Sequence, residues 1–406
     1  MCSDATRSTD SPEPTGSQGD GFDRRTVGLV SGAHFAHDCY PAFIGVLLPL
    51  LIPRLGISLA MAGLLASGVR WTTLIQPMLG HWADRTETRY WVIVAPTTTA
   101  LFMSLVGVAP NTLSLFVLLL ATGFSHAAFH PPAGALVTRV SGTRWGKGMS
   151  YFMTGGELGR AVGPLFIASV VAAVGLEYSW VAFFPGLVAS YVLYRRIGRT
   201  HSLPLQEPPG QIREALRQGW KIVLLVGMAV GLRAVLNVGL ITFYPTLATG
   251  VGASLVAAGL AVAVYEVGAT VGAFLGGGLS DRIGRKAMLA LSIVVGVPLC
   301  IGGILLGPGV AGLALLGFGG LALISAHPVQ LVVMQELFPR NRSAAVGMIY
   351  FMTTGGAIVA TIAVGALGDV VGLQTALLAA GGLALAALPF IALLPETSRG
   401  DQALGS

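Results

Sequence analysis

The chain has 406 residues, of which 54% are hydrophobic and only 10% are charged. The remaining polar residues are too few to cover the surface of a soluble globular protein. The composition therefore excludes a water-soluble protein and predicts a membrane protein. The net charge of +6 comes without a basic stripe interleaved with aromatic residues, so no nucleic-acid partner is expected. Three scattered cysteines predict neither a disulfide framework nor a thiolate metal site, and no cofactor or resident metal is expected.

Residues 1–25 are rich in Ser, Thr, Pro, Gly and Asp and are predicted to form a disordered cytoplasmic tail. They are not a signal peptide, because the apolar run that follows is too long. Twelve apolar stretches follow, each near the length of about 20 residues at which a helix crosses a bilayer core. In chain order they are 26–52, 58–82, 90–109, 112–138, 146–173, 179–196, 220–247, 254–279, 287–306, 311–337, 343–369 and 373–394.

Six of these stretches lie in residues 26–198 and six in residues 220–395. We therefore predict an all-α polytopic membrane protein, a monomer built from two pseudo-symmetric six-helix bundles. A cytoplasmic linker is expected at 199–219 and a second cytoplasmic tail at 396–406. Most Lys and Arg residues fall in segments on the side of the N-terminal tail, so the positive-inside rule places both termini in the cytoplasm.

The two halves of the sequence repeat one another. Gly80-His81-Trp82-Ala83-Asp84-Arg85 returns 197 positions later as Gly277-Gly278-Leu279-Ser280-Asp281-Arg282, and His130-Pro131 returns at the same offset as His327-Pro328. Many transporters are duplicated in this way, with the substrate site at the interface between the halves.

Each copy of the repeated loop is predicted to be a conformational latch. Its residues are Gly80, Asp84, Arg85 and Arg89 in the first half, and Gly277, Asp281, Arg282 and Arg285 in the second. The glycine lets two helix ends approach, and the aspartate could face a neighbouring helix N-terminus while the arginines stay at the cytoplasmic surface. The alternative is a solvated turn with topology-fixing charges, but two copies at one offset favour a shared mechanical element.

The Gly, Asp-Arg, Arg pattern of these loops resembles the signature of the major facilitator superfamily, and the resemblance covers residues 26–396. More narrowly, three segments are similar to the fosmidomycin-resistance family of bacterial proton-coupled exporters. They are His34-Phe35-Ala36-His37-Asp38, Phe129-His130-Pro131, and Glu157-Leu158-Gly159-Arg160 with Gly163-Pro164. Gly159-x-x-x-Gly163-Pro164 also resembles the helix 5 motif of antiporters. The resemblance implies a secondary transporter of the bacterial inner membrane that works by alternating access. Charged Glu157 and Arg160 depart from the family pattern, so substrate identity is not inherited.

Ionisable residues near the middles of the predicted helices indicate a site, because each costs about 2.5–3.5 kcal/mol in a membrane if left unpaired. They are Asp38, Arg70, Glu157, Arg160, Arg233 and Glu266. In the superfamily fold, helices 1, 4, 7 and 10 line the cavity. This fold would gather Asp38, His34, His37, His126, His130, Arg233, Asn237 and His327 around one space.

Asp38 is the predicted proton carrier, because a carboxylate beside His34 and His37 can exchange protons in a desolvated cavity. Glu157 is a further proton-coupling candidate, although Glu157 and Arg160 could equally form a structural ion pair. The candidate substrate contacts are Arg233, Asn237, His126, His130, His327, Arg160, Arg70 and Glu266. For Arg70 and Glu266 the alternative is a bond to a neighbouring helix, and for His130 and His327 it is a role in bending a helix.

Arg233 is the expected main contact for an anionic group, with Asp38 as its partner in the empty cavity. We therefore predict a proton-coupled antiporter that exports a small anionic organic molecule or drug. Transport of a divalent metal or metal chelate through the cavity histidines is an alternative. An intramembrane enzyme is disfavoured by the duplication and by the lack of a nucleophile motif, so no enzymatic activity is expected.

Overall fold

The structure, a computed structural model, describes residues 21–75, 89–197, 212–338 and 342–395. Within these ranges the regular structure is entirely helical. The helices are α1 (Arg24–Cys39), α2 (Phe43–Leu55), α3 (Leu59–Trp71), α5 (Arg89–Ser104), α6 (Thr112–Val140), α7 (Trp145–Val174), α8 (Phe183–Arg196), α9 (Ile212–Gly250), α10 (Leu255–Ile283), α11 (Arg285–Leu306), α12 (Val310–Ile324), α13 (Ala326–Leu337), α14 (Arg342–Val371), α15 (Leu373–Leu385) and α16 (Ala387–Ala392). Short 3₁₀ segments, at Thr72–Ile75, Leu105–Val108, Gly142–Arg144 and Leu176–Ala182, adjoin them.

Each predicted membrane span corresponds to one helical segment, and some of these segments are divided into two α-helices. Eleven helical segments of the described chain are long and apolar enough to cross a membrane. A shorter apolar helix, Leu59–Ile75, takes the place of the second predicted span, whose last residues, 76–82, lie outside the described part. The expected all-α polytopic membrane protein is therefore confirmed.

Proline interrupts two of these spans at defined places. Proline has no N–H, and its ring clashes with the carbonyl group four residues earlier. Ile324, four residues before Pro328, is the last residue of α12, and Pro41 lies in the gap between α1 and α2. The break at Pro41 leaves Asp38 on the last turn of α1, in the middle of the first span.

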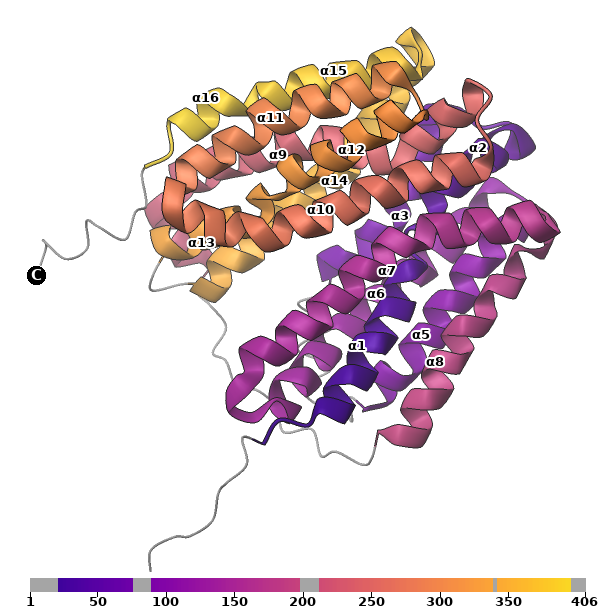
Figure 1. The fold of residues 1–406 in the computed structure, drawn as a ribbon, viewed down its shortest axis with the longest axis horizontal. Coiled ribbons are helices and arrows are strands. Elements are labelled where there is room, and N and C mark those ends of the chain that lie inside the picture. Colours follow the sequence, from indigo (N-terminus) through magenta and orange to yellow (C-terminus); the bar gives the residue numbers. More distant parts are fainter. Residues whose placement is uncertain (1–20, 76–88, 198–211, 339–341, 396–406) are drawn as a thin grey trace, which may run out of the picture.

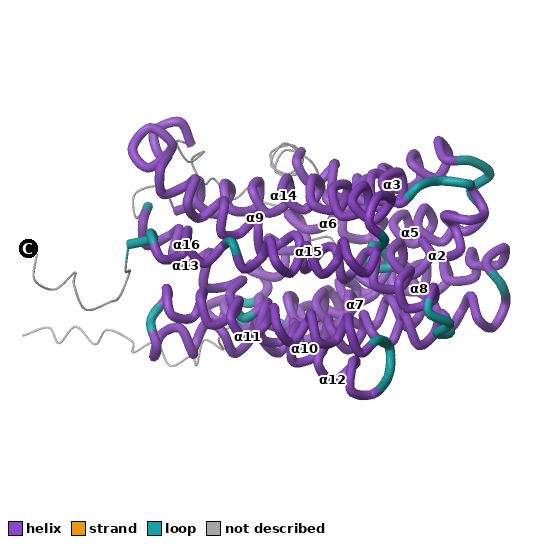
Figure 2. The backbone as a smooth tube through the Cα atoms, turned by 90° about the horizontal axis from the view of Figure 1, so that it is seen from above, coloured by secondary structure: helices purple, strands orange, loops and turns teal. Residues whose placement is uncertain are grey.

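The helices form two groups, one from each half of the sequence (Figure 1). The groups touch where α2 and α3 pack against α9 and α14, and where α7 packs against α10. The long helices run along the molecule, and most loops join them at its two ends (Figure 2). We call the end where α1 begins and α16 finishes the tail end, and the opposite end, where α2 finishes and α3 begins, the far end.

Toward the far end, glycines bring the backbones of the two halves into contact. A Cβ atom on Gly63 of α3 would lie 2.5 Å from the Thr361 carbonyl oxygen of α14, and a Cβ atom on Gly259 of α10 would lie 2.7 Å from the Pro164 carbonyl oxygen of α7. Cβ atoms do not approach oxygen so closely, so a larger residue at either position would push the helices apart. These two contacts, Gly63 with Thr361 and Gly259 with Pro164, are called the far-end seam below.

A carboxylate also joins the two halves at the far end. Asp369, near the end of α14, accepts hydrogen bonds from the backbone N–H groups of Leu59 at 2.8 Å and Ala60 at 2.9 Å. These groups are at the start of α3, where the N–H groups have no partner within the helix and the helix dipole favours negative charge. Asp369 therefore stabilises the conformation in which the far end is closed.

Asp369→Ala is expected to shift the protein toward conformations that are open at the far end. Loss of such a helix cap costs about 0.5–2 kcal/mol, and here that cost falls only on the closed conformation. Distances between spin labels at Leu113 and Val310, two exposed residues at the far ends of the two halves, measure the shift. Glu177→Gln removes an exposed far-end carboxylate and is the control that is expected to leave the distances unchanged. Identical distance distributions in Asp369→Ala and wild type would show that the cap does not hold the halves together.

Candidate functional site

The carboxylate of Asp38 lies at the centre of a cluster of histidines. Asp38 is only 2% exposed. Its Oδ2 atom lies 3.3 Å from His34 Nε2, and its Oδ1 atom lies 2.9 Å from His37 Nδ1. From α6, His130 Nε2 and His126 Nδ1 lie 3.6 Å and 3.7 Å from Oδ1. The structure thus brings together five predicted site residues from the first and fourth spans, and we call them the Asp38 cluster.

Hydrogen bonds to backbone carbonyl groups determine where two of these rings carry hydrogen. His34 Nδ1 lies 2.7 Å from the Phe152 carbonyl oxygen, and His130 Nδ1 lies 2.8 Å from the His126 carbonyl oxygen. A carbonyl oxygen only accepts, so both Nδ1 atoms are donors and both Nε2 atoms carry lone pairs when the rings are neutral.

The two Nε2 atoms nevertheless lie 3.2 Å apart, and the Asp38 carboxylate is beside them. Two lone pairs and a carboxylate therefore face one point without a hydrogen between them. Such an arrangement of acceptors is stable only when a proton or another cation lies among them. The Asp38 cluster therefore offers acceptors to a proton or another cation.

Aromatic rings and a glycine hold the cluster in place. Phe152 stacks on His34 with the ring centroids 4.0 Å apart, and Phe129 stacks on His37 with the centroids 4.3 Å apart. A Cβ atom on Gly156 would lie 2.5 Å from the His34 ring, so α7 can pack against α1 here only through glycine. The packing leaves the imidazoles little freedom to turn away from Asp38.

Two polar residues that support the cluster are absent from the predicted site. Thr99 Oγ1, on α5, lies 3.1 Å from His37 Nε2 and donates a hydrogen bond of 2.7 Å to Ser125 Oγ on α6. Both Thr99 and Ser125 are buried. The run of threonines at 97–99, in the middle of an apolar span, is the sequence pattern that could have identified this support.

Asp38 also lines a cavity of about 190 Å³ between the two halves. The other charged residues in its wall are Arg70 of α3, Arg160 of α7 and Glu266 of α10. Arg160 Nη1 lies 3.8 Å from Asp38 Oδ2, and Arg160 Nη2 forms an ion pair with Glu157. Within the described chain, the side chains of Arg70 and Glu266 form no hydrogen bond or ion pair within 4.0 Å, and they interact electrostatically with each other and with Arg160.

The charged groups around this cavity do not balance by themselves. The carboxylates are Asp38, Glu157 and Glu266, and the guanidinium groups are Arg70 and Arg160. One excess negative charge in a membrane interior is costly. A single proton on the Asp38 cluster makes the whole set neutral.

A wider cavity of about 560 Å³ lies between the tail-end parts of α1 and α7. Arg24 and Lys147 contribute to its wall near the tail end, and Phe35 and Gly155 contribute to it close to the Asp38 cluster. The far-end seam lies at the other end of the molecule. The wider cavity thus lies at the end of the molecule opposite the far-end seam.

Neither Asn237 nor His327 lines the cavity of about 190 Å³, although His327 lies close enough to Glu157 and Arg160 to interact with them electrostatically. The amide oxygen of Asn237 accepts a hydrogen bond of 2.7 Å from the Tyr265 hydroxyl group. His327 is half-buried in the first turn of α13 and is not among the residues that line the cavity.

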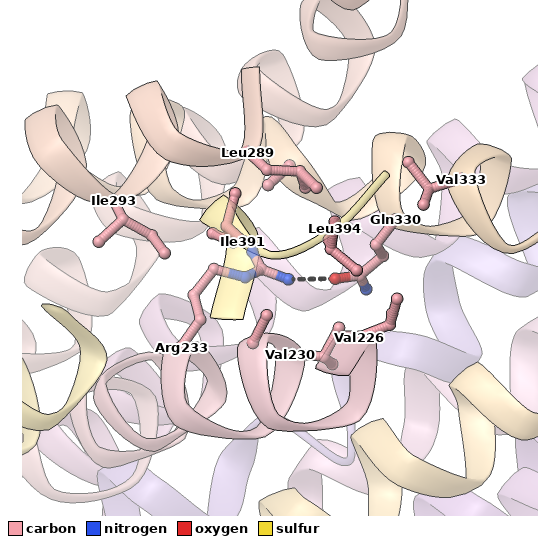
Figure 3. Close-up of a pocket in the computed structure, with 11 residues that line it drawn as sticks. Val226, Val230, Arg233, Leu289, Ile293, Gln330, Val333, Ile391 and Leu394 are labelled. Carbon is pink, nitrogen blue, oxygen red and sulfur yellow. Dashed lines mark hydrogen bonds between the residues drawn. The ribbon is translucent and has the colours of Figure 1, made fainter. Parts of the chain in front are cut away.

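Arg233 lies in the interior of the second half rather than in the central cavity. Its side chain donates hydrogen bonds of 2.7 Å to the Leu323 carbonyl oxygen and 2.8 Å to Gln330 Oε1 (Figure 3). The predicted pairing of Arg233 with Asp38 is therefore wrong in this structure. The physical reason is the rotation of α9, which turns Arg233 toward α12 and α13, and a helix that is apolar on most sides does not reveal its rotation in the sequence.

Only part of the predicted latch can be placed. Gly80, Asp84 and Arg85 lie outside the described residues, and Arg89 is half-buried at the start of α5. In the second copy, Gly277 is half-buried in α10 and Arg282 is exposed near the end of that helix.

Arg285, rather than Asp281, makes the longer-range contact of the second copy. Its guanidinium lies 2.6 Å from Asp281 and from Ser280 Oγ, and 3.4 Å from Glu336 of α13. Asp281 is 60% exposed and Arg285 only 11%, which is the reverse of the expected arrangement. A buried cation between two carboxylates ties the turn after α10 to α13.

Membrane-spanning helices in two repeated halves, with a polar and charged cavity between them, define a membrane transporter rather than an enzyme. The profile of the Major Facilitator Superfamily matches residues 30–236 and 226–405. The chain belongs to this superfamily, as its loop pattern indicated.

The relatives agree with this assignment. The chain is 24% identical over 388 residues to the uncharacterized MFS-type transporter YfnC of Bacillus subtilis (strain 168), and 93% of each chain is covered. It is also 24% identical over 346 residues to the fosmidomycin resistance protein of Escherichia coli (strain K12), covering 81% of this chain and 82% of that protein. The expected similarity to the fosmidomycin-resistance family is therefore confirmed.

Among solved structures, a bacterial homolog of the human lysosomal transporter Spinster in an inward-facing, unoccupied conformation has the same fold. The TM-score is 0.74 at 16% sequence identity, and the match covers 93% of this chain and 98% of the other.

Proposed function

We propose that the protein is a proton-coupled antiporter that exports a small organic molecule by alternating access. The proposal rests on three acceptors that converge on one point, namely His34 Nε2, His130 Nε2 and the Asp38 carboxylate. These acceptors lie 3.2 to 3.6 Å apart and require a proton between them. Asp38 lies in the wall of the cavity between the halves, so a proton and a substrate compete for one space.

The charge around the cavity supports the exchange of a proton for a cationic molecule. With one bound proton the charged groups sum to zero, and a monocation that replaces the proton keeps that sum. An anion on Arg160 would instead draw this guanidinium away from Asp38, so Asp38 would hold its proton more tightly and the anion and the proton would travel together. The expected anionic substrate depended on Arg233, which lies elsewhere, so we propose a cationic substrate in its place.

Both termini are proposed to lie in the cytoplasm of a bacterium, with the protein in the inner membrane as a monomer. The basic residues Arg24, Arg89, Lys147 and Arg195 are at the tail end, where the positive-inside rule places the cytoplasm. In that orientation the far-end seam faces the outside and the wider cavity at the tail end faces the cytoplasm, where an exporter takes up its substrate.

The relatives support export, because one of them is a fosmidomycin resistance protein. The Gly159-x-x-x-Gly163-Pro164 element supports antiport. In the structure, Gly159 and Gly163 pack against the backbone of Phe35 and Cys39, directly beside the Asp38 cluster. The element therefore fixes the distance between α7 and the cluster.

Transport into liposomes tests the proposal. Purified protein is placed in liposomes with an acidic lumen, and uptake is measured for organic molecules of charge +1, 0 and −1, with a pH-sensitive dye inside. We expect cations to accumulate while the lumen loses protons. Uptake of anions together with protons when the gradient is reversed, so that the lumen is alkaline, would overturn both the antiport and the substrate class.

A second candidate function is favoured by the ligand geometry of the same cluster. Histidines that bind metals usually donate their other ring N–H to a carbonyl or carboxylate group, as His34 and His130 do here. The spacing of 3.2 Å between the two Nε2 atoms, and of 3.3 Å between His34 Nε2 and Asp38 Oδ2, is close to the edge of about 3.3 Å of a tetrahedron with zinc bonds of about 2.0–2.1 Å. A divalent cation such as Zn²⁺ would then be the cargo.

The same liposomes with a zinc-sensitive dye inside test this candidate. Zinc uptake that is driven by the pH gradient and lost in His130→Gln would make Zn²⁺ the cargo. Uptake of organic cations that is unaffected by a zinc chelator, together with no zinc uptake, would exclude it.

A further inference from the structure

The second half of the protein contains a small pocket that is separate from the central cavity. It has a volume of about 20 Å³, and α9, α11, α13 and α16 contribute to its wall. Apart from Arg233 and Gln330 the wall is made of apolar side chains, such as Val230, Leu289 and Ile391 (Figure 3). No acidic residue of the described ranges lines it.

Arg233 is a buried charge without a charged partner among the described residues. It is 7% exposed, and its two hydrogen bonds go to the Leu323 carbonyl oxygen and to Gln330 Oε1, which are both neutral groups. Guanidinium remains protonated in proteins and has five N–H donors, of which these bonds use two. Burying such a cation without a counter-ion is strongly unfavourable.

Gln330 adds an unused donor to the same pocket. Its side chain is 2% exposed, and because Oε1 accepts from Arg233, the orientation of the amide is determined. The Nε2 group is buried and has no hydrogen-bond partner in the described part of the structure. The pocket therefore offers N–H donors and a positive charge, and its one side-chain acceptor is already in use.

The repeat shows which group is absent. Gly56-Ile57-Ser58-Leu59 returns 196 positions later as Gly252-Ala253-Ser254-Leu255, and at this offset Arg233 corresponds to His37 and Ala234 corresponds to Asp38. In the first half the buried cluster contains the Asp38 carboxylate. The second half has a methyl group at the equivalent position, so its buried cation lacks the anion that the first half supplies.

We propose that this pocket binds a small inorganic anion, of the size of chloride, between Arg233 and Gln330. A space of about 20 Å³ exceeds the roughly 10–15 Å³ that one water-sized particle needs, so a compact ion fits and an organic acid does not. A water molecule suits the pocket less well, because its hydrogens would find no free side-chain acceptor there. The site supplies a counter-ion to the second half and does not depend on the proposed transport activity.

Thermal unfolding in three salts tests the proposal. The unfolding midpoint of the purified protein is measured in sodium chloride, sodium bromide and sodium gluconate at equal ionic strength, because gluconate is too large for the pocket. We expect the midpoint to rise with halide concentration and to saturate. Gln330→Glu places a carboxylate on Arg233, so its midpoint in gluconate is expected to exceed that of wild type and to be independent of chloride.

Arg160→Gln, which removes an arginine of the central cavity, is the control that is expected to keep the chloride response. If Gln330→Glu does not fold, the loss of the chloride response in Arg233→Met provides the same test. Bromide-soaked crystals are expected to show anomalous density beside Arg233. An equal midpoint in chloride and gluconate for the wild type, or a chloride response that persists in Gln330→Glu and Arg233→Met, would overturn the proposal.

Discussion

Asp38→Asn is expected to abolish transport driven by a pH gradient while the protein stays folded and still binds substrate. The asparagine amide can donate a hydrogen bond to His34 Nε2, which lies 3.3 Å from the carboxylate, so the cluster no longer needs a proton. The charge around the cavity is then neutral without any proton to release. Substrate accumulation in liposomes with an acidic lumen should fall to the level of liposomes without protein.

Two measurements separate this result from misfolding. Substrate binding by calorimetry is expected to persist in Asp38→Asn, because the mutation leaves the Glu266 carboxylate in the cavity wall. Glu177→Gln, an exposed carboxylate at the far end, is expected to transport like wild type. Accumulation at the wild-type rate in Asp38→Asn would exclude Asp38 as the proton carrier.

Glu266→Gln is expected to weaken the binding of a cationic substrate by about 1.5–3 kcal/mol, the contribution of a hydrogen bond to a charged group. This corresponds to a loss of affinity of about 10- to 150-fold. The carboxylate of Glu266 lines the cavity without an ion pair in the described chain, so it is available to a ligand. Calorimetry with a cationic substrate and a neutral analogue measures the effect, and only the cation should lose affinity.

Arg70→Gln is the matched variant, since Arg70 occupies the equivalent position of the first repeat and lines the same cavity. Removing this positive charge is expected to leave the affinity for a cation unchanged or to increase it. The opposite pattern, with binding retained in Glu266→Gln and lost in Arg70→Gln, would identify the cargo as an anion and reject the proposed substrate class.

The positions of the membrane spans follow from the sequence because burial of about 20 apolar residues dominates all other local preferences. The Asp38 cluster also follows largely from spacing. His34, His37 and Asp38 lie one turn apart on one helix, and any pair of helices that buries a carboxylate must surround it with polar partners. Proline positions further locate the break directly after that cluster.

The direction in which the Arg233 side chain points could not be predicted from the sequence in the same way. Hydropathy fixes how deep a residue lies in the membrane, but the rotation of α9 is set by its contacts with α12 and α13. Helix-to-helix partners such as Gln330 come from positions 97 residues away in the chain, and no local pattern encodes that pairing. The prediction that Asp281, rather than Arg285, makes the longer-range contact was wrong for a similar reason. Arg285 contacts Glu336, which is also distant in the sequence.

The far-end seam also bears on the insulation of the membrane. At Gly63 and Gly259 the two halves meet through backbone atoms, with no room for even one additional carbon atom. A water molecule is at least as large, so none fits between the backbones at these two contacts. A continuous path of water between the halves would let protons cross the membrane without coupled transport. Direct contact between glycine and a carbonyl oxygen prevents such a proton leak at these positions.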